Sequence, residues 1–246
     1  MKKRRNRSKL FIATKVGFAY PGVKEGLTTH QIERECEKSL KRLGIETIDL
    51  YYAHVDDRYT NIEETLEAFN RLIKAGKIRF IGASNYLSWR LEEAHWISKI
   101  NNWSEYCCIQ QRYSYLRPNP GGLFTPQISA NRDLLNYTQS RNITLLAYSP
   151  LLNGAYTQED RSFPEQYSGS DMKGRLAELN AVSKELGVTI NQVIYAWMMN
   201  NNPPIIPLMA ASNTFHMQEN LESLTLDLNE EYIERLNNSC TGGNAW

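Results

Sequence analysis

Residues 48–54 read IDLYYAH, a short apolar run that ends on His54 and is followed by charged residues at 56–58. A run of this length with turn signals on both sides is typical of a strand buried on both faces. Parallel α/β folds keep their active sites at the carboxyl ends of such strands, where His54 stands. The alternative is a histidine that only makes a structural hydrogen bond at a strand end, so the rest of the chain must decide.

The composition is that of an ordinary water-soluble globular protein of 246 residues, 41% hydrophobic and 22% charged. A formal net charge of +1 gives no reason to expect nucleic acid or a membrane surface as a partner. Residues 1–9 are basic, but the apolar run after them is short and contains Lys15, which disfavours a signal peptide. We expect this segment to be the solvated end of a helix leading into a strand. No stretch approaches the length of a transmembrane helix.

The cysteines are Cys36, Cys107, Cys108 and Cys240. Cys107 and Cys108 are adjacent, so in a regular strand their side chains would face opposite sides of the sheet. There is no Cys-x-x-Cys pair. We therefore predict neither a disulfide framework nor a structural metal site, and the cysteine usage favours a cytoplasmic protein.

Strand-like and helix-like patterns alternate six times along the chain. Strands are predicted at about 10–16, 48–54, 77–85, 107–111, 142–150 and 204–208. Helices are predicted after Thr28–Thr29 with a stop at Gly44, from Asn61 to Gly76, from Ser88, and over about 125–140, 173–186, 190–200, 214–222 and 229–237. Residues 153–171 have little periodicity and are predicted to form a long functional or mobile loop.

Several helix ends carry specific signals. Asn61 is a candidate N-cap, and Glu64 three residues later would complete a capping box. Ser88, Thr189 and Asn229 are expected to cap the helices that follow them.

This alternation predicts a parallel sheet, either closed as a barrel or open and doubly wound. An open dinucleotide-binding sheet normally carries a Gly-x-Gly-x-x-Gly run after a strand, and the chain has no such run. Its absence favours the barrel.

Polar residues stand where the predicted strands end. They are Lys15, His54, Ser84 and Asn85, Gln110 and Gln111, Tyr148 and Ser149, and, near the last strand, Ser212 and Asn213. In a (β/α)8 barrel the strand ends converge on one mouth, the catalytic face. A desolvated Lys15 has a lowered pKa or lowers that of a neighbouring tyrosine, and a neutral His54 can donate a hydrogen bond to a carbonyl oxygen. Both properties suit chemistry at an aldehyde or ketone.

Five motifs, in this order, resemble the aldo-keto reductase superfamily, in particular bacterial members related to potassium-channel β subunits. They are IATKVG at 12–17, DLYYAH at 49–54, GKIRFIGASN at 76–85, AYSPL at 147–151 and ENL at 219–221. The resemblance implies an α/β fold of the (β/α)8 TIM-barrel type and a single domain over residues 1–246.

The resemblance also implies site residues. Lys15 and His54 match two members of the family's catalytic tetrad. The matched cofactor-binding residues are Ser84, Asn85 and Gln110 at the nicotinamide carboxamide, Tyr148 stacked on its ring, Ser149 and Leu151 along the pyrophosphate, and Ser212, Glu219 and Asn220 around the adenosine end.

The aspartate and tyrosine of that tetrad precede the position of Lys15 in the family. Only nine residues precede the Lys15 strand here, so we expect an N-terminally truncated chain of about six strand–helix units that lacks the first two. Six strands would leave exposed sheet edges that favour association. Tyr20 and Tyr52 are the tyrosines considered as substitutes for the missing acid, and Tyr52 is expected to point away from the mouth.

The resemblance predicts an NAD(P)H-dependent reductase of a small carbonyl substrate, whose identity the loops would set. One alternative is a catalytically defective fragment or a non-catalytic cofactor-binding or interaction protein. Another is a Schiff-base aldolase that uses Lys15. The cofactor is expected to be NADP(H), with NAD(H) as the alternative, because no Arg or Lys stands near Ser212 and His216 falls where many members carry Arg or Gln.

Overall fold

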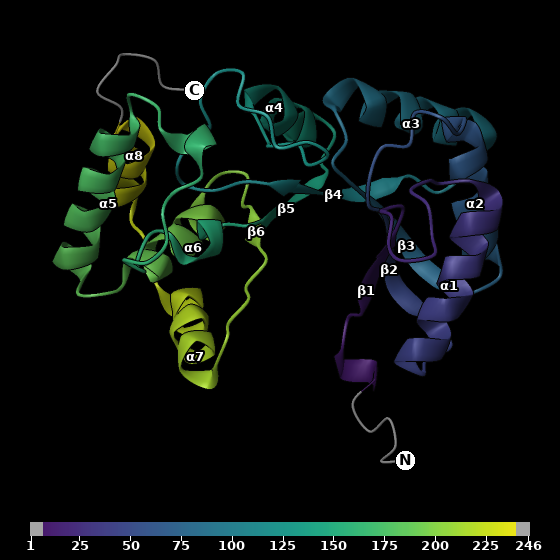
Figure 1. Ribbon diagram of the computed structural model, residues 1–246, viewed down its shortest axis with the longest axis horizontal. Coiled ribbons are helices and arrows are strands. Elements are labelled where there is room, and N and C mark those ends of the chain that lie inside the picture. Colours follow the sequence, from purple (N-terminus) through teal and green to yellow (C-terminus); the bar gives the residue numbers. More distant parts are fainter. Residues whose placement is uncertain (1–6, 240–246) are drawn as a thin grey trace. The chain divides into compact units, whose positions relative to one another are not determined.

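The computed structural model describes residues 7–239, where six parallel strands alternate with helices as predicted (Figure 1). The strands are β1 (Ala13–Val16), β2 (Ile48–Ala53), β3 (Ile78–Ser84), β4 (Tyr106–Arg112), β5 (Thr144–Tyr148) and β6 (Ile206–Pro207). The α-helices are α1 (Thr29–Leu43), α2 (Ile62–Lys74), α3 (Ser88–Asn101), α4 (Arg132–Ser140), α5 (Met172–Leu186), α6 (Ile190–Asn200), α7 (Thr214–Glu222) and α8 (Glu230–Asn238). Short 3-10 helices are η1 (Arg7–Lys9), η2 (Leu152–Gly154), η3 (Glu165–Tyr167) and η4 (Ser223–Thr225).

The chain folds into two compact units, the first ending at Gln110 and the second beginning at Gln111. The prediction of one domain over 1–246 stays a prediction. Cys240 and residues 1–6 of the basic segment lie outside the described residues. Residues 7–9 of that segment form η1, which leads toward β1.

In the first unit, consecutive strands pair in parallel and α1, α2 and α3 lie along one side of β1–β3 (Figure 1). Every residue of β2 is buried, which confirms the predicted strand buried on both faces. Tyr51 faces the helices: its hydroxyl lies 3.4 Å from the Ile32 carbonyl of α1, and its ring lies 5.6 Å from that of Phe69 in α2. Because neighbouring strand residues point to opposite sides, Tyr52 faces away from the helices. We call the side of β1–β4 that Tyr52 faces the inner face.

The predicted helix ends are confirmed where they depend only on neighbouring residues of the chain. The Thr28 hydroxyl accepts the Gln31 N–H of α1, and Gly44 ends that helix with a left-handed φ of 64°. Thr189 forms a full capping box with Gln192, and Asn229 caps α8. Leu43 is 46% exposed because it is the last residue of α1, beyond the buried stripe that ends at Leu40.

One predicted capping box and one predicted cap are wrong. Asn61 caps α2 by accepting the Glu63 N–H, but Glu64 does not complete a capping box. The Glu64 carboxylate instead accepts a hydrogen bond from the Thr29 N–H at the start of α1, at 2.9 Å. This contact between two helices therefore replaces the hydrogen bond that Glu64 would make to the Asn61 N–H in a capping box. Ser88 is the first residue of α3 rather than its cap.

The helix predicted over 125–140 begins only at Arg132. The Arg112 N–H donates to the Ile128 carbonyl, and the Ala130 N–H donates to the Arg112 carbonyl at 2.8 Å. This pairing holds residues 128–130 in an extended conformation that excludes a helix there. Asn131 then caps α4 by accepting the Leu134 N–H.

A buried carboxylate, Asp49, joins the amino-terminal ends of the first three strands. It accepts the Ile12 N–H at 2.8 Å and forms ion pairs with Arg7 at 2.7 Å and Arg79 at 3.0 Å. Burial alone would raise the pKa of this carboxyl, but the hydrogen bonds and charges of its partners outweigh it and lower that pKa below its ordinary value. We call this arrangement the Asp49 clamp.

In the second unit, β5 pairs with β6, and Leu208 continues the pairing by donating its N–H to the Ala147 carbonyl at 2.8 Å. The strand predicted over 204–208 is only two residues long, because Pro207 has no N–H for a ladder. Helices α5 and α8 pack side by side, and Arg235 of α8 pairs with Glu178 and Glu185 of α5 (Figure 1).

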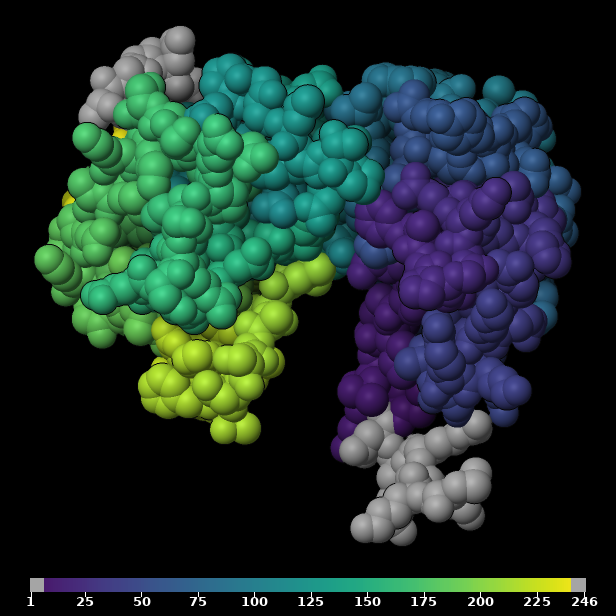
Figure 2. All heavy atoms as spheres, viewed as in Figure 1, coloured from purple at the N-terminus to yellow at the C-terminus, as the bar shows by residue number. Residues whose placement is uncertain are grey.

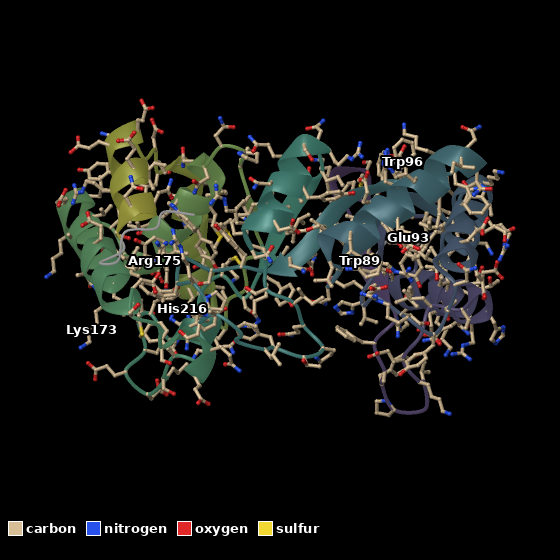
Figure 3. The ribbon with its side chains drawn as sticks, turned by 90° about the horizontal axis from the view of Figure 1, so that it is seen from above. Trp89, Glu93, Trp96, Lys173, Arg175 and His216 are labelled. Carbon is tan, nitrogen blue, oxygen red and sulfur yellow. The ribbon has the colours of Figure 1, made fainter. Side chains whose placement is uncertain are left out.

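The surface carries several exposed apolar side chains. Trp89 and Trp96 lie along α3, each 54% exposed (Figure 3), while Leu91 and Ala94 of the same helix are buried. In the second unit, α7 stands at the surface in yellow-green (Figure 2), and its Phe215 is 75% exposed. Among the helices of residues 7–239, none is long and apolar enough to cross a membrane.

Candidate active site

The carboxyl ends of β1 and β2 bring Lys15 and His54 to neighbouring positions. Lys15 pairs with Tyr52 across the two strands, and the His54 N–H donates to the Val16 carbonyl at 2.8 Å. Both side chains are half-buried. The parallel pairing of β1 with β2 therefore places the two predicted catalytic residues side by side in the first unit.

Their surroundings disfavour positive charge on both side chains. Burial lowers the pKa of Lys15 below its ordinary value. Burial first, and then the positive charge of Lys15, lowers the pKa of His54 to about 4. At neutral pH His54 is thus a neutral imidazole, which carries one N–H donor and one acceptor nitrogen.

The ring and backbone of His54 are held from both sides. The Phe18 ring lies 4.2 Å from the His54 ring, centroid to centroid, at an interplanar angle of 56°. The Asn85 side-chain amide donates to the His54 carbonyl at 3.0 Å. These contacts fix the position from which the imidazole can form a hydrogen bond with a ligand.

Ser84 and Asn85, which were predicted to contact the nicotinamide carboxamide, lie at the end of β3. Both are buried, and the Asn85 amide also donates to the Ser84 hydroxyl at 3.2 Å. Asn85 has a left-handed φ of 59°, a conformation that asparagine adopts more readily than most residues. Asn85 therefore has a structural role, joining the ends of β2 and β3, alongside the predicted one.

Gln110, the third predicted carboxamide contact, pairs with Ser84 across β3 and β4. It is 6% exposed, and it is one of the side chains that influence the pKa of Tyr52 on the inner face. The structure therefore brings five predicted residues together in the first unit: Lys15, His54, Ser84, Asn85 and Gln110.

Neither tyrosine considered as a substitute acid presents a free hydroxyl. Tyr20 donates to the Glu35 carboxylate at 2.5 Å, toward α1. The prediction that Tyr52 points away from the mouth side is wrong: Lys15 Nζ lies 5.7 Å from the Tyr52 ring centroid, because paired residues of parallel strands share a face. The Tyr52 hydroxyl, however, accepts a hydrogen bond from Cys108 at 3.5 Å, in the direction of β4. Burial also raises the pKa of Tyr52 well above its ordinary value.

The remaining predicted residues lie in the second unit and are described there by themselves. Tyr148 ends β5, is half-buried, and has its pKa raised to about 12 by burial. Ser149 follows with a left-handed φ of 55°, and its carbonyl accepts the Leu152 N–H at 3.2 Å. The Ser114 hydroxyl donates to the Pro150 carbonyl at 2.6 Å. Leu151 thus sits in a turn that the fold holds in place.

Ser212, Glu219 and Asn220 flank or belong to α7. Ser212 is exposed and bonds the His216 ring at 3.1 Å, and His216 is marked in Figure 3. Glu219 is half-buried, with its carbonyl accepting the Gln192 amide. Asn220 is buried and donates to the Ala210 carbonyl at 3.2 Å, which closes the loop before α7.

One residue that the sequence reasoning missed is Arg112. Its guanidinium carbon lies 4.6 Å from the Phe124 ring centroid and 5.8 Å from that of Tyr148, and its nitrogens donate to Gln127. Arg112 positions the predicted stacking residue Tyr148. The available signal was a cation directly after Gln110 and Gln111 at a strand end. Within residues 7–239, no group of three or more His, Cys, Asp or Glu side chains could hold a metal ion.

Comparisons with known proteins agree on one family. The family model described as "Aldo/keto reductase family" matches residues 1–240. An aldo-keto reductase of Strobilurus tenacellus is 28% identical over 95% of this chain and 69% of its own length. An aldo-keto reductase of Schizosaccharomyces pombe named for NADP(+) is 27% identical over 95% and 70%, and a norsolorinic acid reductase of Emericella nidulans is 25% identical over 94% and 60%. The chain thus spans about 60% to 70% of these relatives.

A solved structure of a thermostable aldo-keto reductase in complex with the inhibitor epalrestat is similar in fold. Its TM-score is 0.74 and its identity 30%, over 95% of this chain and 72% of that one. This match confirms the predicted α/β class of TIM-barrel type. The residue roles at the site stay predictions.

Proposed function

Because the chain belongs to the aldo/keto reductase family, we propose that it is an NAD(P)H-dependent oxidoreductase that reduces an aldehyde or ketone to an alcohol. The observation that carries the proposal is the pair of half-buried side chains, Lys15 and His54, at adjacent strand ends with lowered pKa values. Such a pair suits a carbonyl group, because the neutral His54 ring still carries one N–H, which can donate a hydrogen bond to the carbonyl oxygen. Lys15 beside it favours the negative charge that develops there.

The residues present fit a nicotinamide cofactor at its reactive end. Ser84, Asn85 and Gln110 are buried polar side chains at adjacent strand ends, which suits an amide ligand such as the carboxamide. In the second unit, the half-buried ring of Tyr148 offers a flat stacking surface. When bound, the reduced cofactor supplies the hydride, while the side chains of this protein bind and orient the carbonyl and limit access of water.

At the adenosine end the support is weaker for NADP(H) than for NAD(H). Residues 210–220 contain no Arg or Lys, so no fixed cation stands in that segment for a 2′-phosphate. His216 is already hydrogen-bonded to Ser212. The relative named for NADP(+) supports NADP(H). We propose that the protein accepts both cofactors, and comparing its affinity for NADPH and NADH tests this.

A second candidate function is cofactor binding without turnover. It is favoured by the tyrosine hydroxyls: Tyr20 is engaged by Glu35, and Tyr52 by Cys108. Without a positioned proton donor at the carbonyl, a reductase would lose about 10² to 10⁴ in rate.

The two candidates are separated by measuring cofactor binding and turnover on one preparation. Binding is followed by quenching of tryptophan fluorescence, and turnover by loss of the reduced-nicotinamide absorbance with a panel of aldehydes and ketones. Turnover that falls by about 10² or more in His54→Gln, with Ile100→Ala unchanged, supports the reductase. Ile100 is a suitable control because it is 80% exposed on α3. Binding without turnover supports the second candidate, and absence of binding contradicts both.

A further inference from the structure

The pairing of β3 with β4 is irregular at one point. Ile81 pairs with Tyr106 and Ala83 pairs with Ile109, with a register shift between them. Gly82 alone on β3 therefore stands opposite two residues on β4, Cys107 and Cys108. Two residues opposite one is the definition of a β-bulge, which changes the direction of the side chains at the extra residue.

This bulge turns both thiols to the inner face. Tyr106 points to the helices, with its ring 6.5 Å from that of Phe69. Cys108 points to the other side, where its sulfur lies 3.5 Å from the Tyr52 hydroxyl. Cys107 is the extra residue between Tyr106 and Cys108, and the bulge turns its side chain to the same side as that of Cys108. The prediction that they face opposite sides is wrong, because it assumed a regular strand.

The pair is reachable from solvent on one side. Cys107 is exposed, whereas Cys108 is buried. The neighbouring Cys108 side chain is the first cause that lowers the pKa of Cys107, which favours its reactive thiolate. Phe80 stands two residues before Gly82 on the same side of β3 and is 44% exposed, which places an aromatic surface near the thiols.

Two outcomes are open to such a pair, and the geometry favours one. Adjacent Cα atoms lie about 3.8 Å apart across a trans peptide, which is below the usual range of about 4.4–6.8 Å in disulfides. A direct bond between the sulfurs would therefore be strained. A larger atom that bonds both sulfurs spans them without bringing them into contact.

We propose that Cys107 and Cys108 form a dithiol site that captures a soft, thiophilic centre able to bond two sulfurs, such as an aryl arsenic(III) compound. Soft centres select thiolate ligands over harder donors. The exposed Phe80 ring suits an aryl group on the captured compound. Capture removes the hydrogen bond that Cys108 donates to Tyr52.

The capture step is balanced without an oxidant. In an aryl arsenoxide, the bond between arsenic and oxygen breaks and two arsenic–sulfur bonds form. The two thiol protons leave with the oxygen as one water molecule. The oxidation states of arsenic and sulfur do not change.

Phenylarsine oxide is the probe, and the readout is the intact mass of the full chain. We expect one arsenical to be added with loss of one water. The adduct should survive glutathione, a monothiol, and be removed by dimercaptopropanol, a dithiol, because two sulfur bonds resist exchange with one thiol. Cys107→Ser and Cys108→Ser should each lose the glutathione-resistant adduct.

The matched controls are Cys36→Ser and Cys240→Ser, which should keep the adduct. Cys36 is buried in α1, away from the inner face. The urea midpoint of each variant is measured to confirm that it is folded. The proposal is overturned if the native protein forms no such adduct, if either Cys107→Ser or Cys108→Ser retains it, or if a control variant loses it.

Discussion

Gly82 is the position where one added methyl group should have a large and calculable effect. An alanine Cβ there would lie 2.7 Å and 2.8 Å from two ring carbons of Tyr52 and 2.8 Å from the Cys108 sulfur. All three separations are shorter than real Cβ contacts. The ring cannot move away easily, since Tyr52 is 1% exposed, with Lys15 Nζ over its ring and the Cys108 sulfur at its hydroxyl.

The expected size follows from two opposing effects. Overpacking a tight site costs typically about 1–3 kcal/mol. Replacing glycine by alanine at an unstrained backbone position restores about 0.4–1 kcal/mol by restricting the unfolded chain. The φ of Gly82 is not left-handed, so the second effect applies. Gly82→Ala should therefore lower the free energy of unfolding by about 1.3 kcal/mol, the difference between the midpoints of the two ranges, about 2 and about 0.7 kcal/mol.

The assay is urea unfolding followed by fluorescence and circular dichroism, combined in a double-mutant cycle with Tyr52→Val. Valine lacks the two ring carbons that clash, so Gly82→Ala should cost at least about 0.5 kcal/mol less in that background. Equal costs in both backgrounds, or a stabilising Gly82→Ala in the native background, would refute the reasoning about the Tyr52 ring.

Three further effects follow from single contacts. Since the pKa of His54 is lowered to about 4 in the fold, the unfolded chain binds this proton first. Stability is therefore lost as the pH falls from 6.5 toward 4, by about 1–2 kcal/mol after allowance for solvent, and urea titrations of His54→Gln should lack this loss. Thr189→Ala removes a capping box and should cost about 1 kcal/mol, whereas Thr189→Ser should cost little. Asn220→Ala leaves the Ala210 carbonyl without its donor and should cost about 1–3 kcal/mol in urea, against less than about 0.5 kcal/mol for the exposed Ser212→Ala. An equal cost at Asn220 and Ser212 would contradict the assigned contact.

The sequence predicted those features whose causes are local. The period of the apolar residues located all six strands, and the caps at Thr28, Thr189 and Asn229 follow from oxygen atoms next to the helix starts. The strand ends also identified Lys15 and His54, because parallel strands end on one edge of a sheet.

The errors arose where distant segments compete for the same groups. Glu64 accepts a hydrogen bond from Thr29 of α1 instead of completing its own capping box, and the sequence of α2 alone does not predict this contact. Residues 128–130 pair with Arg112, which shortens the predicted helix. The bulge at Cys107 depends on the register between β3 and β4. The alternation of apolar and polar residues within one strand does not determine how that strand is aligned with its neighbour.

The Asp49 clamp holds the amino-terminal ends of the first three strands, away from His54 at the carboxyl end of β2. Asp49 and His54 are five residues apart on one strand, or about 16 Å at about 3.3 Å per residue. Because the pKa of Asp49 is lowered, its contribution is present above the ordinary carboxyl range and is lost as the pH falls through the lowered value.

Amide hydrogen exchange should therefore report two ends of the same strands that respond to acid separately. The Ile12 amide loses its acceptor when Asp49 is protonated, while the His54 amide, bonded to the Val16 carbonyl, keeps its own. The end that secures the strands is thus separate from the end that carries the proposed chemistry. Substitutions can accumulate at one end without directly disturbing the other.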